Sequence, residues 1–174
     1  MRKEILIIGT GGQGVKTLAE ILGEAAAHAG FWPFVYPRYT PAARGGEITS
    51  SVVVTDRHDS YPLAEDPDII VLLSPHIPEE FFSTKAHWIF DPAILPPPDV
   101  FAIKRGAANH MPLDGLIRDI RKNPSANLMI LGVIQGLMPL FEVKNLLAAV
   151  KKILGAEKYP KNKKFLRQGR KMLI

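Results

Sequence analysis

The 174-residue chain contains no cysteine. Without thiolates it can form no disulfide framework, no thiolate zinc site and no cysteine-ligated iron–sulfur cluster. Any redox metal that serves this protein therefore has to sit on another polypeptide. The five histidines are scattered, with no two at the three- or four-residue spacing of metal ligands, so we predict no metal site. Paired carboxylates and a Gly-x-Ser-x-Gly nucleophile motif are also missing, and we predict no catalytic residue.

Long hydrophobic segments are absent as well. The longest apolar run, residues 128–138, contains Gln135 and is 11 residues long, whereas a membrane-spanning helix needs about 20. The apolar stretch that follows Met1-Arg-Lys-Glu is too short for a secretion signal and has no small-residue cleavage site. We therefore expect a cytoplasmic protein without a membrane partner, in which residues 128–138 form a buried helix.

Acidic residues are nearly absent from the last part of the chain. Residues 151–174 contain nine lysines and arginines but one acid, Glu157, which gives this part a net charge of +8. Because the whole chain carries +5, residues 1–150 carry −3. The basic part has two aromatic residues, too few for stacking on nucleic-acid bases. We expect a basic helical tail from about residue 156 that faces solvent or a partner protein, and no nucleic-acid binding.

Hydrophobic residues make up 47% of the sequence, enough for the core of a single domain over residues 1–174. Apolar runs bounded by glycine or proline predict strands, and apolar residues that recur every three or four positions predict helices. This alternation favours an α/β fold, a three-layer α/β/α sandwich that is Rossmann-like with a mostly parallel or mixed sheet. Predicted strands cover residues 4–9, 34–36, 47–55, 68–73, 87–90 and 100–103; the first helix covers 15–29, and the part after 103 is predicted to be helical.

Two glycines, Gly132 and Gly136, lie four residues apart in the predicted helix that starts near Asn127. At this spacing both fall on one side of the helix, where they let another backbone approach closely. We expect this side to pack tightly on the sheet.

A glycine-rich loop, Gly9-Thr-Gly11-Gly12-Gln13-Gly14, connects the first predicted strand to the first helix. Its G-x-G-x-x-G spacing, the strand before it and the helix after it predict an anion site built from backbone N–H groups. No acid occurs between Glu24 and Glu47 to hold the ribose of NAD, but Arg38 could meet the 2′-phosphate of NADP. A nucleotide-hydrolysing P-loop does not fit, because Val15 separates the last glycine from Lys16.

A second glycine-rich loop, Arg44-Gly45-Gly46, comes just before the predicted strand 47–55. Arginine offers a planar pair of donors to a phosphate or carboxylate, and the glycines leave space around it. Together the two loops predict one anion-binding surface at one end of the sheet. The candidate cofactor-binding residues are Gly11, Gly12, Gln13, Gly14, Arg44, Gly45 and Gly46.

Both loops occur in a familiar arrangement. Gly11-Gly-Gln-Gly-Val15, followed about 30 residues later by Pro41-x-x-Arg-Gly-Gly46 and the strand up to Asp56, resembles the gamma subunit of the 2-oxoacid:ferredoxin oxidoreductases. The same unit forms an internal domain of single-chain pyruvate:ferredoxin oxidoreductases. The start of the helix at Asn127 also resembles this family. Thr40 and Ala42 depart from it, because they stand where a glycine and a glutamate are usual.

This resemblance implies a subunit of an enzyme that converts a 2-oxoacid and CoA into an acyl-CoA and CO2, with electrons passed to ferredoxin. Thiamine diphosphate, magnesium and iron–sulfur clusters are then expected on alpha, beta and delta-type partner subunits, and the isolated chain is expected to be inactive. CoA contact with the two loops is our hypothesis. The sequence does not specify the 2-oxoacid. Two alternatives stay open: a free-standing NADP-binding protein, and a non-catalytic interaction module.

Overall fold

The computed structural model describes residues 1–40, 46–75, 85–95, 109–112, 120, 125–157 and 159–173. These residues build a six-stranded sheet in the order β2-β3-β1-β4-β5-β6. β1 pairs in parallel with β4 and antiparallel with β3, so the sheet is mixed and the predicted α/β fold is confirmed. The strands are β1 (Arg2–Thr10), β2 (Trp32–Tyr39), β3 (Glu47–Thr55), β4 (Ile69–Leu72), β5 (His87–Phe90) and β6 (Asn109–Pro112).

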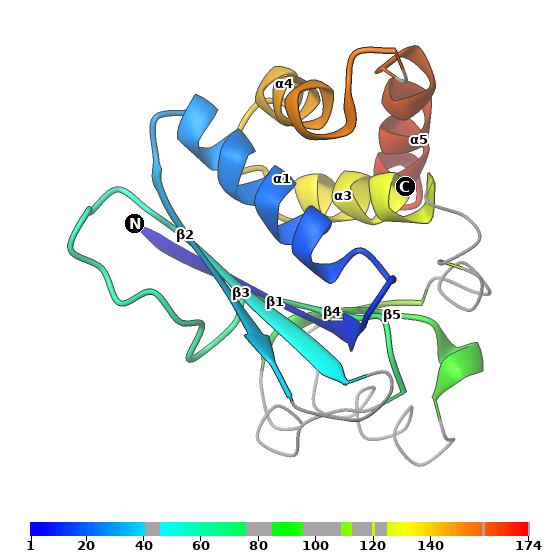
Figure 1. The fold of residues 1–174 in the computed structure, drawn as a ribbon, viewed down its shortest axis with the longest axis horizontal. Coiled ribbons are helices and arrows are strands. Elements are labelled where there is room, and N and C mark those ends of the chain that lie inside the picture. The colour runs from blue at the N-terminus through cyan, green and yellow to red at the C-terminus, as the bar shows by residue number, and fades with distance from the viewer. Residues whose placement is uncertain are drawn as a thin grey trace.

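The helices are α1 (Val15–His28), α3 (Ser125–Leu137), α4 (Val143–Leu154) and α5 (Tyr159–Lys171), with a short 3-10 helix η2 (Pro92–Ile94). Figure 1 shows α1, α3, α4 and α5 on the same face of the sheet. Ile5 and Ile7 of β1 are buried in the apolar cluster on that side. None of the helices in the described part of the chain is both long and apolar enough to cross a bilayer.

The other face of the sheet is also apolar and buried. Leu6 and Ile8 of β1 form a second cluster with Trp88 and Phe90, and Ile94 of η2 packs against it. Alternating residues of β1 therefore face opposite sides, as expected for a strand buried on both faces. The described residues place only η2 against this face, so they do not test the predicted third layer of helices.

β2 is longer than the predicted strand 34–36, since it continues through Pro33 and Pro37. The N–H of Thr40 donates to the carbonyl oxygen of Glu47 at 2.9 Å. Along a strand of an antiparallel pair, the backbone N–H positions point alternately toward the partner strand and away from it. The N–H of Thr40 points toward β3, so the backbone nitrogens of Pro33 and Pro37 point away from it. Proline is tolerated there because β2 is the edge strand and no ladder hydrogen bond is lost.

The region after residue 103 departs from the prediction. Residues 109–112 form β6, which pairs in parallel with β5, so the expectation that this part is helical was wrong there. β6 is short, has no alternating pattern and ends the described sheet, where its proline is tolerated. The predicted strand 100–103 lies outside the described residues.

α3 is the buried helix expected from its apolar sequence, with Ile130 and Leu131 fully buried. The expected contact of its glycines with the sheet was wrong, because they pack against α5 instead. A methyl group on Gly132 would collide with the carbonyl oxygen of Leu166, and one on Gly169 of α5 would collide with the carbonyl oxygen of Met129. The bulky side chains of α3 join the main core, and its glycine side is left for α5.

Candidate functional site

The first glycine-rich loop connects the carboxyl end of β1 to the start of α1. Gly12 and Gly14 have φ angles of 83° and 85°, a conformation that residues with side chains rarely adopt. Gly14 is the N-cap of α1 and offers no capping side chain. No described residue fills the space where a side chain of Gly11 would be, and both Gly11 and Gly12 are exposed. The loop therefore presents backbone rather than side chains to a ligand.

Gln13 holds the loop in place through its side chain. Its Oε1 atom accepts a hydrogen bond from the N–H of Thr10 at 2.6 Å, and its Nε2 atom donates to the carbonyl oxygen of Leu73 at 2.5 Å. The Gln13 amide thus joins the end of β1 to the end of β4. The sequence placed Gln13 among the ligand-binding residues, whereas its side chain is engaged within the protein.

We expect Gln13→Ala to lower the free energy of unfolding by about 2 kcal/mol, because it removes an acceptor from Thr10 and a donor from the carbonyl of Leu73. Urea unfolding monitored by circular dichroism measures the loss. Gln13→Glu retains the acceptor but sets a carboxylate oxygen against the carbonyl oxygen of Leu73, so it should be no more stable than the alanine variant. Equal stability of all three proteins would show that this amide does not hold the loop.

Asn127, near the start of α3, supports the same loop from another side. Its Nδ2 atom donates to the carbonyl oxygen of Gln13 at 3.2 Å, and a methyl group on Gly14 would collide with its amide. The Oδ1 atom of Asn127 is buried and has no hydrogen-bond partner in the part of the chain that the structure describes. The resemblance drew attention to this asparagine, but its distance of 114 residues from Gln13 gave no local signal of the contact.

The second glycine-rich loop starts and ends at the same end of the sheet as the first. Glu47, the first residue of β3, lies opposite Thr10, the last residue of β1. Gly46 precedes Glu47 and is half-buried. Because Glu47 pairs with Thr10, Gly46 lies near the loop Gly11–Gly14. Arg44 and Gly45 lie outside the described residues. The predicted neighbourhood of the two loops is thus supported by Gly46 and Glu47.

The carboxyl ends of β1 and β4 meet at this position. After β1 the chain continues through α1 to β2, which lies on one side of β1 in the sheet, whereas β4 pairs with β1 on the other side. Ligands of open α/β sheets bind at such a reversal of strand order. Ser74, which follows β4, is 2% exposed, and its hydroxyl has no hydrogen-bond partner among the described residues. The described part of the site therefore combines exposed loop backbone with two buried polar atoms that it leaves without a partner, Ser74 Oγ and Asn127 Oδ1.

Arg38, the candidate for an NADP phosphate, is poorly placed for this site. In a dinucleotide-binding fold the second strand neighbours the first, but here β3 lies between β2 and β1. Two strand spacings put β2 about 10 Å from β1. Arg38 is exposed on β2, so the inserted strand argues against NADP binding in the usual arrangement.

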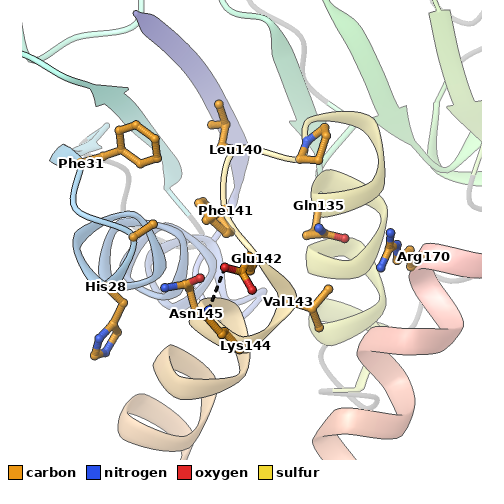
Figure 2. Close-up of a pocket in the computed structure, with 12 residues that line it drawn as sticks. His28, Phe31, Gln135, Leu140, Phe141, Glu142, Val143, Lys144, Asn145 and Arg170 are labelled. Atoms are coloured by element: carbon orange, nitrogen blue, oxygen red, sulfur yellow. Dashed lines mark ion pairs between the residues drawn. The ribbon is translucent and has the colours of Figure 1, made fainter.

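A cavity of about 730 Å³ lies elsewhere, at the other end of α1. Figure 2 shows its lining from His28 at the end of α1, Gln135 of α3, Glu142 and Lys144 at the start of α4, and Arg170 of α5. The 14 residues of α1 separate it from the glycine loop by about 20 Å, at 1.5 Å per residue. It contains none of the predicted site residues.

The fold and the loop define the class of this domain: a Rossmann-like α/β domain with an inserted antiparallel strand and a glycine loop at the reversal of strand order. The family model described as pyruvate ferredoxin/flavodoxin oxidoreductase matches residues 4–172. The chain belongs to this family, which confirms the resemblance drawn from its two loops.

Individual relatives are similar over parts of their length. The 2-oxoglutarate synthase subunit KorC of Methanothermobacter marburgensis is 44% identical over 75 residues, which are 42% of this chain and 40% of that protein. The indolepyruvate oxidoreductase subunit IorB of Archaeoglobus fulgidus is 29% identical over 125 residues, which are 70% of this chain and 61% of that protein. The match to KorC thus spans less than half of its length.

Solved structures share the fold. The gamma subunit of a keto/oxoacid ferredoxin oxidoreductase from Geobacter sulfurreducens superposes with a TM-score of 0.72 at 23% identity, over 98% of this chain and 97% of that one. The 2-oxoglutarate:ferredoxin oxidoreductase from Magnetococcus marinus, solved with 2-oxoglutarate, CoA and succinyl-CoA bound, superposes with a TM-score of 0.76 at 17% identity. That match covers 98% of this chain and 31% of the other.

Proposed function

We propose that this chain is the gamma-type subunit of a multi-subunit 2-oxoacid:ferredoxin oxidoreductase, which converts a 2-oxoacid and CoA into an acyl-CoA and CO2. The observation that carries the proposal is the family match over residues 4–172, nearly the whole chain. The similarity in fold to a separate gamma subunit over 97% of its length supports the same role.

The redox chemistry then belongs to partner subunits of the alpha, beta and delta types. Cluster ligation in this enzyme class requires cysteine, and this chain has none. Its described residues also contain no group of three or more metal-ligating side chains. Thiamine diphosphate with its magnesium ion and the iron–sulfur clusters supply the decarboxylation and electron transfer when bound to those partners, and ferredoxin receives the electrons. This chain contributes binding surface.

The test of this role is reconstitution with the polypeptides encoded beside it. We expect the chain to co-purify with them and the complex to reduce methyl viologen when it is given a 2-oxoacid and CoA. The isolated chain should show no such activity. An equally active complex that assembles without this chain would overturn the proposed role.

We propose further that the two glycine-rich loops contact CoA. CoA carries a diphosphate and a 3′-phosphate, and exposed backbone N–H groups at a helix start suit such anions. Asn127 Oδ1 and Ser74 Oγ, which have no partner among the described residues, supply polar groups beside the loop, and the described neighbours of Gly11 leave room for close approach. Gly45 and Gly46 provide similar freedom next to Arg44, whose guanidinium is suited to a bidentate phosphate contact.

Arg44→Ala in the assembled complex is expected to weaken CoA binding about tenfold, the size of one lost charge-assisted contact. The KM for CoA should rise while the KM for the 2-oxoacid stays unchanged. Arg38→Ala is the matched control, because it removes an exposed arginine from the neighbouring strand β2. Unchanged CoA affinity in the Arg44 variant would remove this residue from the site.

A further inference from the structure

The last helix, α5, carries a concentration of positive charge without any acidic residue. It contains six lysines and arginines within its 13 residues. Four of them surround a hollow of about 360 Å³ together with Gln168. We call these four the basic face: Lys163, Lys164, Arg167 and Lys171. Three of the four are exposed and Lys163 is half-buried.

The charges of the basic face are not neutralised by any described residue of the protein. None of its four cations forms an ion pair in the described part of the chain. Six other described lysines and arginines do bind a carboxylate: Arg2, Lys3, Lys16, Arg57, Lys144 and Lys152. Like charges that crowd on one helix repel each other and lower its stability. The described part of the chain therefore holds no carboxylate that balances the basic face.

The basic face is also not needed to hold α5 in place. α5 packs on α3 through Leu166, which is 1% exposed, and through Gly169, whose Cα atom lies close to the backbone of α3. These residues lie on the side of α5 that contacts α3, whereas Lys164, Arg167 and Lys171 are exposed. The packing of the helix and its charge are thus separate features.

The composition of the basic face favours an acidic protein over other anionic partners. Single-stranded nucleic acid would call for exposed aromatic side chains, but Phe165 is half-buried and lies under the Lys161 ammonium at 6.0 Å. A membrane surface would require exposed bulky apolar residues between the cations, and the residues around the hollow include none. Acidic side chains of a protein complement the charge of the hollow.

The same composition favours a partner that binds and leaves. Permanent subunit interfaces are apolar at their centre and poor in lysine. Charged surfaces without an apolar centre mainly accelerate encounter and set orientation, and salt weakens them. The described basic face has this second character.

We propose that the basic face of α5 is the docking surface for an acidic electron-carrier protein, the ferredoxin that accepts electrons from the assembled enzyme. This inference rests on the proposed function, which requires a mobile protein acceptor. The chain carries no electrons itself; α5 attracts the acidic carrier to the complex and orients it, and the clusters of partner subunits reduce it.

The test uses the assembled complex with Lys164→Glu, Arg167→Glu and Lys171→Glu combined. At low ionic strength the KM for an acidic ferredoxin should rise at least tenfold, whereas methyl viologen reduction should be unchanged. The difference from wild type should shrink as salt is added, because screening weakens the wild-type attraction. A second variant with glutamine at the same three positions should give a smaller rise in the KM for ferredoxin. This variant removes the charge without reversing it, so it tests the proposal even if the glutamates disturb the folding of α5.

The matched control combines Arg38→Glu, Lys85→Glu and Lys151→Glu, which changes the net charge equally at exposed cations outside α5 that form no ion pair in the described part of the chain. A ferredoxin KM that changes equally in both triple variants would overturn the proposal. Loss of assembly in the α5 variant alone would instead make this face a subunit interface. Binding of a 20-base-pair DNA that disappears in the α5 variant, with ferredoxin kinetics intact, would make it a nucleic-acid site. No viologen reduction by the wild-type complex would contradict the proposed function itself.

Discussion

Gly132→Ala is expected to lower the free energy of unfolding by about 3 kcal/mol and to loosen α5 from α3. The added methyl group would collide with the carbonyl oxygen of Leu166 and approach the backbone nitrogen of Arg170 to 2.8 Å. Both atoms belong to the backbone of α5, so no side-chain rotation relieves the contact and the helix has to move. Urea unfolding measures the loss, and faster trypsin cleavage after the lysines and arginines of α5 reports its release.

Gly136→Ala on the same helix is the matched control. Its methyl group would meet the Cδ1 atom of Leu173, the end of a flexible side chain that can turn away. Both substitutions gain about 1 kcal/mol of helix propensity, so the difference between them isolates the backbone collision. If the two variants were equally stable, the close approach of α3 and α5 would not contribute as we infer. A released α5 should also raise the KM for ferredoxin, which links this packing to the proposed docking surface.

The partner of these glycines shows what the sequence could not supply. Glycines four residues apart indicate that a backbone approaches one side of a helix, but they do not say which element provides it. The basic residues of α5 suggested a solvated tail, and its contact residues Leu166 and Gly169 give a weak apolar pattern among the charges. The pairing of α3 with α5 depends on tertiary packing and is seen only in the structure.

Strands with strong local patterns were predicted well. The alternation in residues 47–55 and the apolar run 87–90 gave the bounds of β3 and β5 as the structure has them. β2 was predicted too short because proline was treated as a strand boundary, and its place at the sheet edge removes that penalty. The insertion of β3 between β1 and β2 could not be predicted, because strand order depends on contacts between distant segments.

At the candidate site, the spacing of the glycines predicted the loop between β1 and α1. The positive φ angles of Gly12 and Gly14 explain why glycine is needed at these positions. The role of Gln13 was missed, because an amide next to glycines looks like a ligand contact when its distant acceptor, the carbonyl of Leu73, is unknown. The contact of Asn127 with the loop could not be predicted for the same reason, since this residue reaches the loop from α3. The conformation of the loop could therefore be predicted from its own sequence. The contacts that hold it involve distant segments and could not be predicted.

Gly14→Ala is expected to destabilise the protein by about 3 kcal/mol. A residue with a side chain at the φ of 85° found here is strained by about 1–2 kcal/mol. The new methyl group would also displace the Asn127 amide and break its 3.2 Å hydrogen bond to Gln13, at a further cost of about 1 kcal/mol. Because Gly14 is the N-cap of α1, the start of this helix should shift and CoA affinity should fall as well. Urea unfolding and CoA titration of the complex measure the two effects.

Gly11→Ala separates these two effects, because no described atom lies within 4 Å of the position its methyl group would take. Its free energy of unfolding should stay within about 0.5 kcal/mol of the wild type, as for an ordinary surface substitution. If the loop backbone contacts CoA, the same methyl group blocks close approach and the KM for CoA rises in a stable protein. A Gly14 variant as stable as the Gly11 variant would contradict the support that Asn127 gives the loop. Normal CoA affinity in the Gly11 variant would place the CoA phosphates away from Gly11, because a backbone contact there tolerates no side chain.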